Sequence, residues 1–312
     1  MLKTRPKKAR ILYLLIIFFI IVPEVFPAQT DTLPDNTINK KRLRVVAYGS
    51  AAAYTVALTG LYFIWYKDNL SLPFHFINDS KYWLQLDKAG HMTTAYTLSN
   101  YSYWLLRWSN VPENKSIGYG ALMGFGAMTV IEILDGFSAD YGASVYDLTA
   151  NTLGVGIFAG QQLLWHEQRF RLKYSYHPTD YPQYNPGKLG ESTPQCVLKD
   201  YNGQTYWLSA NIASFIKRES KFPSWINIAV GYGGDGMLAE VTNPEYDNEG
   251  NPLPHYDRVR QYYLSMDIDW TRIKTNSKFL NFLFKGLSFV KIPFPTLEYN
   301  KSDKLVFHWI YF

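Results

Sequence analysis

The sequence predicts an α+β protein, with an N-terminal bundle of about four hydrophobic helices followed by a β-rich half of antiparallel hairpins. Long segments with few charges occupy the first half of the chain. From Glu167 onward Gly, Pro and Tyr become frequent and the apolar period shortens toward two. The length of 312 residues allows one large or two modest domains. We therefore expect a helical, membrane-associated core at residues 45–166 and a β-rich domain at residues 167–312.

Residues 1–28 have the composition of a secretory signal peptide. Five basic residues between Lys3 and Arg10 precede an uncharged apolar run, Ile11 to Val22, and the small residue Ala28 follows two prolines. This run is too short to span a bilayer comfortably. We expect cleavage near Ala28, with an uncleaved anchor as the alternative, because Phe26 fits poorly where a small residue is usual.

The charge of the mature chain gives no support to a nucleic-acid partner. The formal net charge is +5, and removing residues 1–28 takes away five basic residues and Glu24, which leaves about +1. Cys196 is the only cysteine, which excludes intrachain disulfides and cysteine metal clusters. A lipid-anchored N-terminus is not expected, because no cysteine ends the signal.

Residues 29–44 read as a polar linker, and the uncharged stretch Val45 to Tyr66 is long enough to span a bilayer. Gly49, Ala53 and Ala57 share one face of this segment, so we expect another helix to approach there. A buried helix of a soluble bundle is the alternative. Three more helices are predicted, at residues 82–108, 115–137 and 144–165, the last beginning with a Ser-x-x-Asp helix start.

The C-terminal half predicts about six strands. Asn202-Gly203 suits a tight turn, so we expect a hairpin of residues 197–201 and 204–208. Further strands are expected at residues 225–232 and 261–270, with a final hairpin at 298–312 and a helix-like stretch at 279–285. The Gly-rich segment 231–236 is interpreted as a β-turn. Six strands are too few for a complete outer-membrane barrel, and a partial barrel with a helical plug is the weakest alternative.

Polar side chains at helical spacing mark the candidate site. Asp87 and His91 are four residues apart, Glu132 and Asp135 three apart, and Asp147 and Asn151 four apart, so each pair shares one helix face. Gly120, Gly124 and Gly154 extend two of these faces and permit close helix contact. Because buried carboxylates are costly unless paired or metal-bound, we expect the three faces to converge.

Three interpretations of this cluster stay open. It is structural, with Lys88 offsetting acidic charge and Asn151 completing hydrogen bonds. It binds a divalent metal, zinc, manganese or iron, through His91, Glu132 and Asp147. Or it is catalytic, with Asp87, His91 and Asp135 as the hypothetical catalytic residues and His91 paired with a carboxylate as general base.

The order of these residues resembles the YfiM-like family of uncharacterised bacterial envelope proteins. The residues are Asp87-Lys88-x-x-His91, Glu132-x-x-Asp135, and Ser144-x-x-Asp147-x-x-x-Asn151-x-x-Gly154. The pattern is also similar to that of the VanZ-like membrane proteins. The long C-terminal half resembles an extended form associated with Bacteroidetes-type bacteria. The resemblance implies an envelope location and a helical membrane-associated core, and it implies no reaction.

We therefore predict a membrane-associated protein in the cell envelope of a Gram-negative bacterium, at the outer membrane or on the periplasmic side, with the inner membrane as the alternative. The expected partners are the lipid membrane and another envelope protein. The leading hypothesis is a non-enzymatic role in which the polar cluster is structural. The alternative is a metal-dependent hydrolase or transferase acting on a lipid or cell-wall substrate.

Overall fold

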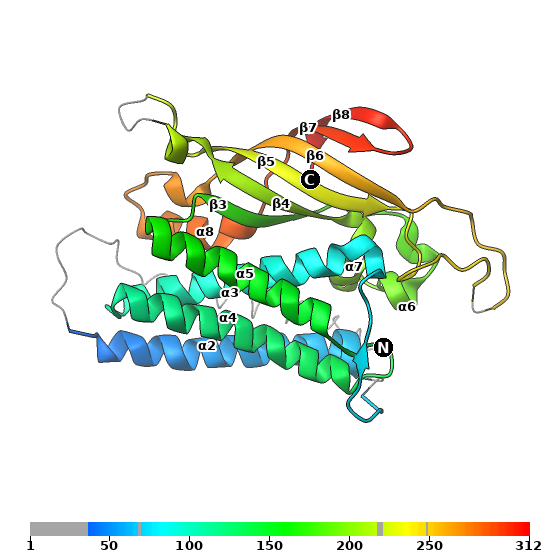
Figure 1. Ribbon diagram of the computed structural model, residues 1–312, viewed down its shortest axis with the longest axis horizontal. Coiled ribbons are helices and arrows are strands. Elements are labelled where there is room, and N and C mark those ends of the chain that lie inside the picture. Colours follow the sequence, from blue (N-terminus) through cyan, green and yellow to red (C-terminus); the bar gives the residue numbers. More distant parts are fainter. Residues whose placement is uncertain (1–36, 68–69, 217–220, 248) are drawn as a thin grey trace, which may run out of the picture.

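The computed structural model describes residues 37–67, 70–216, 221–247 and 249–312. It confirms the predicted α+β class, with a layer of long helices lying against a six-stranded antiparallel sheet (Figure 1). The predicted signal peptide and the first part of the predicted linker lie outside the described residues.

Four long helices form the first layer. They are α2 (Lys40–Leu61), α3 (Leu86–Trp108), α4 (Glu113–Gly136) and α5 (Val145–Trp165), and α2 runs on into a π-helical turn, Tyr62–Tyr66. Helix α2 begins five residues before the predicted start, because the side chain of Asn39 accepts a hydrogen bond from the backbone N–H of Arg42 and caps it there. The last residues assigned to a linker are therefore helical.

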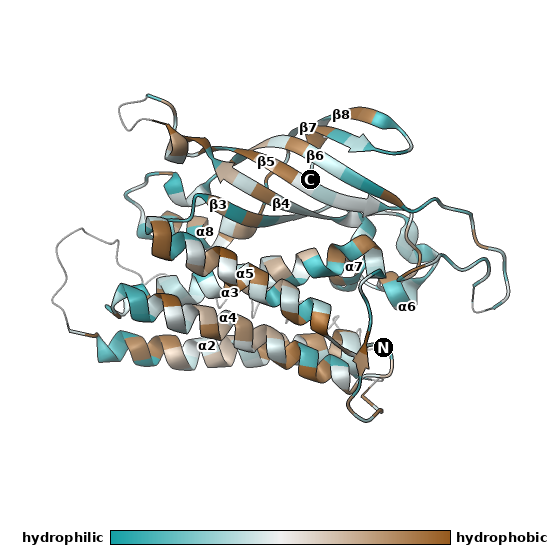
Figure 2. Ribbon diagram, viewed as in Figure 1, coloured by the Kyte–Doolittle hydropathy of each residue, from teal (hydrophilic) through white to brown (hydrophobic). Residues whose placement is uncertain are grey.

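Within the part of the chain that the structure describes, two helices have the length and composition of membrane spans, Lys40–Tyr66 and Glu113–Gly136. Only 6% of the apolar stretch of the first helix is buried, so its apolar side chains face outward. Figure 2 shows apolar residues along α2, α4 and α5, with polar residues at the starts of α2 and α4.

Glycines allow α3, α4 and α5 to pack closely, as the sequence predicts. A Cβ atom added to Gly124 would lie 2.8 Å from the carbonyl oxygen of Ala95, and one added to Gly154 would lie 2.1 Å from that of Met92. The same expectation for α2 is wrong, because a Cβ atom at Gly49 would meet no atom within 4 Å. Helix α2 instead contacts α4 through Tyr54, whose hydroxyl donates to the carbonyl oxygen of Ala127 at 2.7 Å.

The second layer is one antiparallel sheet with the strand order β3-β4-β5-β6-β7-β8. Its strands are β3 (Phe170–Tyr176), β4 (Gln204–Asn211), β5 (Ile226–Asp235), β6 (Val259–Ile268), β7 (Phe294–Asn300) and β8 (Lys304–Tyr311). A separate parallel pair joins β1 (Phe76–Ile77) to β2 (Ala143–Ser144). The short helices are α6 (Pro186–Leu189), α7 (Thr193–Lys199) and α8 (Lys278–Gly286).

The hairpin predicted at residues 197–208 is wrong. Helix α7 occupies its first arm, and Asn202-Gly203 lies in a short 3₁₀ turn before β4. The Asn202 side chain is buried and donates both to Asp200 and to the carbonyl oxygen of Met237, while it accepts from the N–H of Met237. These long-range hydrogen bonds fix a turn that local propensity would place in a hairpin. The first strand of the sheet, β3, was not predicted.

The Gly-rich segment 231–236 is not a turn, because β5 extends through it to Asp235. A Cβ atom added to Gly231 would lie 2.7 Å from the ring of Trp207, and one added to Gly233 would lie 3.0 Å from the ring of Tyr263. These glycines therefore make room for aromatic rings on the inner face of the sheet. The final hairpin and α8 are confirmed.

Candidate functional site

The polar pairs predicted on three helices meet at one end of the bundle. The first turns of α3 carry Asp87, Lys88 and His91, the last turns of α4 carry Glu132 and Asp135, and the first turns of α5 carry Asp147 and Asn151. Asp87, Glu132, Asp147 and Asn151 are buried, whereas the side chains of Lys88 and His91 are 14% and 18% exposed. This acidic cluster is therefore closed on most sides but reaches the surface.

A left-handed turn positions the start of α3. Trp83, Leu84 and Gln85 have φ angles of 48°, 53° and 67°, a conformation that costs roughly 1–2 kcal/mol per residue for side chains larger than glycine. The sheet holds the turn in place, because the hydroxyl of Tyr232 and the guanidinium of Arg260 both donate to the carbonyl oxygen of Leu84. The sheet thus helps to set the positions of Asp87 and Lys88.

Ser144 ties the cluster to the loop between α4 and α5. Its hydroxyl oxygen accepts hydrogen bonds from the N–H groups of Tyr146 and Asp147 and so caps α5. The same hydroxyl donates to Oδ1 of Asp79 at 2.6 Å, and the N–H of Ser144 donates to Oε2 of Glu132 at 3.0 Å. The β1–β2 pairing brings Asp79 close to this cap.

Asp79 is a member of the cluster that the sequence pattern does not predict. It lies in a loop rather than on a helix face, so helical spacing gives no signal for it. The pairing of Ile77 with Ser144, two residues before Asp79, is the long-range contact that brings it in.

Lys88 is the cation of the cluster. Its Nζ atom contacts Asp79 closely and lies 2.8 Å from Oδ2 of Asp87 and 2.9 Å from Oδ1 of Asp147. Three carboxylates from one loop and two helices therefore converge on one ammonium group.

His91 and Glu132 form the other part of the cluster, together with Asn151. The Nδ1 atom of His91 lies 3.3 Å from Oε1 of Glu132, and its Nε2 atom lies 3.9 Å from Oδ1 of Asp147. His91 Nδ1, Glu132 Oε1 and both polar atoms of the Asn151 side chain are buried without a hydrogen-bond partner. Asp147 Oδ1 also lacks a hydrogen bond, although Lys88 lies beside it.

Asp135 makes its side-chain hydrogen bond outside this group. Its Oδ1 atom accepts a hydrogen bond of 2.6 Å from the hydroxyl of Tyr66, at the end of the π-helical turn after α2. Of the seven residues predicted at the site, Asp135 therefore belongs to a separate contact that joins α4 to α2.

Burial and charge shift the ionisation of the cluster. Burial, followed by the charge of Lys88, lowers the pKa of His91 to about 4, which leaves the imidazole neutral at pH 7. Burial also raises the pKa of Asp87 to about 6. The pKa of Asp147 is raised by burial and then by its hydrogen bond with Asp79. The neighbouring carboxylates raise the pKa of Lys88 despite its burial, so it stays protonated.

The cluster holds more carboxyl groups than cations. Asp79, Asp87, Asp147 and Glu132 face one charged lysine, so full ionisation would leave three uncompensated negative charges. Uncompensated charges are costly in a closed site, so the carboxylates must either bind protons or be neutralised by a second cation. Two triads have ligand atoms within 4.8 Å of one another, His91-Glu132-Asp147 and Asp79-Asp87-Asp147. Lys88 already contacts every carboxylate of the second triad, so the first is the better candidate for a metal ion.

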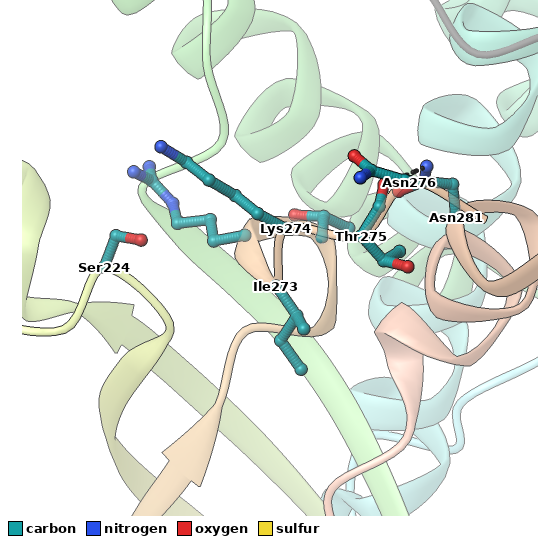
Figure 3. A pocket seen from close by; sticks show the side chains of 8 residues that line it. Ser224, Ile273, Lys274, Thr275, Asn276 and Asn281 are labelled. Carbon is teal, nitrogen blue, oxygen red and sulfur yellow. Dashed lines mark hydrogen bonds between the residues drawn. The ribbon is translucent and has the colours of Figure 1, made fainter. Parts of the chain in front are cut away.

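Two hollows lie elsewhere on the molecule. One, of about 650 Å³, is lined by polar side chains from the segment after β6, together with Ser224 and Asn281 (Figure 3). The other, of about 340 Å³, lies near Arg171 and Trp104. Neither is lined by a residue of the acidic cluster.

Comparisons with known proteins connect this region to one family. None of the curated proteins matches the chain, and no solved structure matches it. The model of a family described as "Predicted periplasmic lipoprotein (DUF2279)" matches residues 75–161, a segment that contains the whole acidic cluster. Over these residues the chain is similar to that family, in agreement with the predicted location in the envelope of a Gram-negative bacterium and with an envelope-associated protein.

Proposed function

We propose that this envelope protein binds one divalent metal ion between α3, α4 and α5, and that the ion holds the helical core together. His91, Glu132 and Asp147 would be its ligands. The observation that carries the proposal is the set of buried atoms without a hydrogen bond at this point, from His91, Glu132 and Asn151. Buried polar atoms are nearly always paired, so a group of them at one place points to a ligand.

The three ligand side chains suit a divalent ion that is intermediate between hard and soft metal ions. One imidazole and two carboxylates are typical ligands of zinc, manganese or iron. Their ligand atoms lie within 4.8 Å of one another, and small side-chain movements would bring them to about 2.0–2.2 Å from a common ion. Asn151, fully buried beside His91, could then accept a hydrogen bond from a water molecule on the ion.

Lys88 and the proposed ion would together neutralise the carboxylates of the cluster. Lys88 neutralises part of the negative charge of Asp79, Asp87 and Asp147. A divalent ion would offset the charge of Glu132 and the negative charge of the three aspartates that Lys88 leaves uncompensated. Because the three ligands come from three helices, the ion would cross-link them. The pattern that resembles those of the YfiM-like and VanZ-like families, Asp-Lys…His, Glu and Asp…Asn, contains the three proposed ligands and Lys88, whereas Asp79 lies outside it.

The test is metal content by mass spectrometry on full-length protein purified in detergent. We expect close to one zinc, manganese or iron ion per chain, lost in His91→Ala and in Glu132→Gln. His166→Ala is the matched control, since His166 also contacts a glutamate but lies outside the cluster. If the wild-type protein contains no metal, and takes up none on dialysis against zinc or manganese, the proposal is wrong and the cluster is a hydrogen-bonded structural network.

A metal-dependent hydrolase or transferase acting on a lipid or cell-wall substrate is the second candidate. The partial exposure of His91 and Lys88 favours it, because a catalytic metal site needs an open position. Turnover of a phosphodiester or ester reporter by the metal-loaded protein, abolished in His91→Ala and kept in His166→Ala, would support this role. A bound metal without turnover would leave the structural role.

A further inference from the structure

The sheet has an inverted distribution of polarity. Its inner face carries buried polar and charged side chains, among them Lys173, Ser209, Asn227 and Asp267. Lys173 and Asp267 pair at 2.7 Å with both side chains fully buried, and Asp267 also accepts a hydrogen bond from Ser209. In a sheet that faces water on one side, the apolar residues normally lie inward and the polar ones outward.

The sheet curls around this polar interior. The hydroxyl of Tyr311 on β8 donates to that of Tyr263 on β6 at 2.6 Å, and it lies 3.2 Å from the hydroxyl of Thr205 on β4. Strands β4 and β8 are separated by three strands in the sheet order. The N–H of Lys291, just before β7, also donates to the carbonyl oxygen of Tyr174 on β3. The polar side chains are thus enclosed, and the apolar side chains form the outer surface.

The outer face is ordered in rows across the strands. One row consists of tyrosines at paired positions of β3 to β7: Tyr174, Tyr206, Tyr232, Tyr262 and Tyr299. The next row, two residues along each strand, is aliphatic apart from its last member: Leu172, Leu208, Val230, Leu264, Leu297 and Phe307. A third row contains Ala210, Ile228 and Met266.

Much of this face is open. Helices cover its β3 end, where Leu172 packs against Tyr96 and Phe158. The start of α3 and the turn before it also cover Tyr206 and Tyr232, which pack against the core cluster of Trp83 and Leu86. From Leu208 onward the side chains of the aliphatic row are exposed apart from half-buried Leu297, with Val230 at 52%, Leu264 at 45% and Phe307 at 52%. Charged residues return just beyond the tyrosine row, at Arg260 and in the turn between β7 and β8. Figure 1 shows β4, β5 and β6 running roughly along the helices beneath them.

We propose that the outer face of β4–β8 contacts the acyl chains of a lipid membrane, with the exposed tyrosines of the row, Tyr262 and Tyr299, at the level of the headgroups. An apolar band bordered by aromatic side chains, and then by charges, is the pattern of lipid-facing strands, whose interior side is polar. A water-exposed surface would not leave apolar rows uninterrupted by charge across five strands. This inference rests on the envelope location and is independent of the metal site.

The test uses nitroxide labels in proteoliposomes of phosphatidylethanolamine and phosphatidylglycerol. Cys196→Ser full-length protein would carry single cysteines at Val230 or Leu264, and at Tyr246 as the matched control. Tyr246 is an equally exposed aromatic residue in the segment between β5 and β6. We expect the ratio of collisions with oxygen to collisions with a water-soluble nickel chelate to be at least several-fold higher at Val230 and Leu264 than at Tyr246.

Two results would overturn the proposal. A nickel accessibility at Leu264 equal to that at Tyr246 would place the face in water. Exclusion of both reagents at Val230 and Leu264 would show that protein, a second copy or a partner, covers it. Because both labelled positions are exposed, the labels need no space inside the fold, and circular dichroism of each variant checks that it is folded.

Discussion

The Nδ1 atom of His91 and the Oε1 atom of Glu132 lie 3.3 Å apart across the contact between α3 and α4, with no hydrogen bond at either atom. Burial keeps the pKa of His91 low, so the two side chains do not form an ion pair at neutral pH. A neutral imidazole facing a carboxyl group without a shared hydrogen bond is well suited to receive a cation between them, with any proton on Glu132 released when the ion binds. The close approach of the helices makes this geometry possible.

Gly154 is required for the close approach of α5 to α3, which brings Asp147 and Asn151 to the same cluster. Replacement by alanine would place a Cβ atom 2.1 Å from the carbonyl oxygen of Met92 on α3 and force the helices apart. We expect Gly154→Ala to lower the free energy of unfolding by about 1–3 kcal/mol, measured by denaturation in detergent micelles. Gly156→Ala, in the same helix with nothing within 4 Å, should raise it by about 0.5–1 kcal/mol. Equal effects of the two changes would contradict the role of close packing.

The sequence predicts the helical half well because its signals are local. The helices are predicted from the stretches with few charges, the Ser144 cap and the small residues near Gly124 and Gly154. Most of the cluster is predicted from the helical spacing of its members, Asp87, His91, Glu132, Asp147 and Asn151. Asp79 is missed because only the pairing of β1 with β2 brings it to Lys88.

The sheet is predicted less well because its polarity is inverted. In β3 the buried residues include Arg171, Lys173 and Ser175, so the strand lacks an apolar inner face. The glycines at 231 and 233 suggest a turn when only neighbouring residues are considered. They lie in β5 because Trp207 and Tyr263, from the adjacent strands, fill the space above them.

Ser144 contributes more than a helix cap. Ser144→Ala would remove the cap of α5, which costs about 1 kcal/mol. It would also leave Oδ1 of buried Asp79 without its donor, which costs a further 1–3 kcal/mol or so. Ser277→Ala removes a cap of the same kind at α8, where the hydroxyl accepts from the N–H of Leu280. Thermal denaturation followed by circular dichroism should show the larger loss for Ser144→Ala, and a loss no greater than that of Ser277→Ala would argue against the link to Asp79.

Lys291 gives the fold a dependence on alkaline pH. Burial lowers the pKa of Lys291 to about 8. The charge of Asp267 offsets only part of this shift, and the charge of Lys173 adds to it. The unfolded chain, with a pKa near 10.4, binds more protons than the folded one between pH 8 and 10.4. Stability from this group therefore rises with pH across that window, by up to about 3 kcal/mol. The free energy of unfolding at pH 7.5 and 10 should rise more in wild type than in Lys291→Met, and equal pH dependence in the two proteins would refute this.

The pair of Lys173 and Asp267 tests the polar interior of the sheet. Both side chains are fully buried and lie 2.7 Å apart, and Asp267 also accepts from Ser209. Lys173→Met alone would leave a buried carboxylate without its cation, so we expect a loss of about 3–5 kcal/mol in the free energy of unfolding. Lys173→Met combined with Asp267→Leu removes both charges and should recover most of that loss, because an apolar pair of similar volume replaces the ion pair. The double-mutant cycle, measured by denaturation in detergent, isolates the coupling between the two residues. A double variant as unstable as the single one would mean that the hydrogen bond from Ser209 to Asp267, rather than the pairing of Asp267 with Lys173, stabilises the sheet.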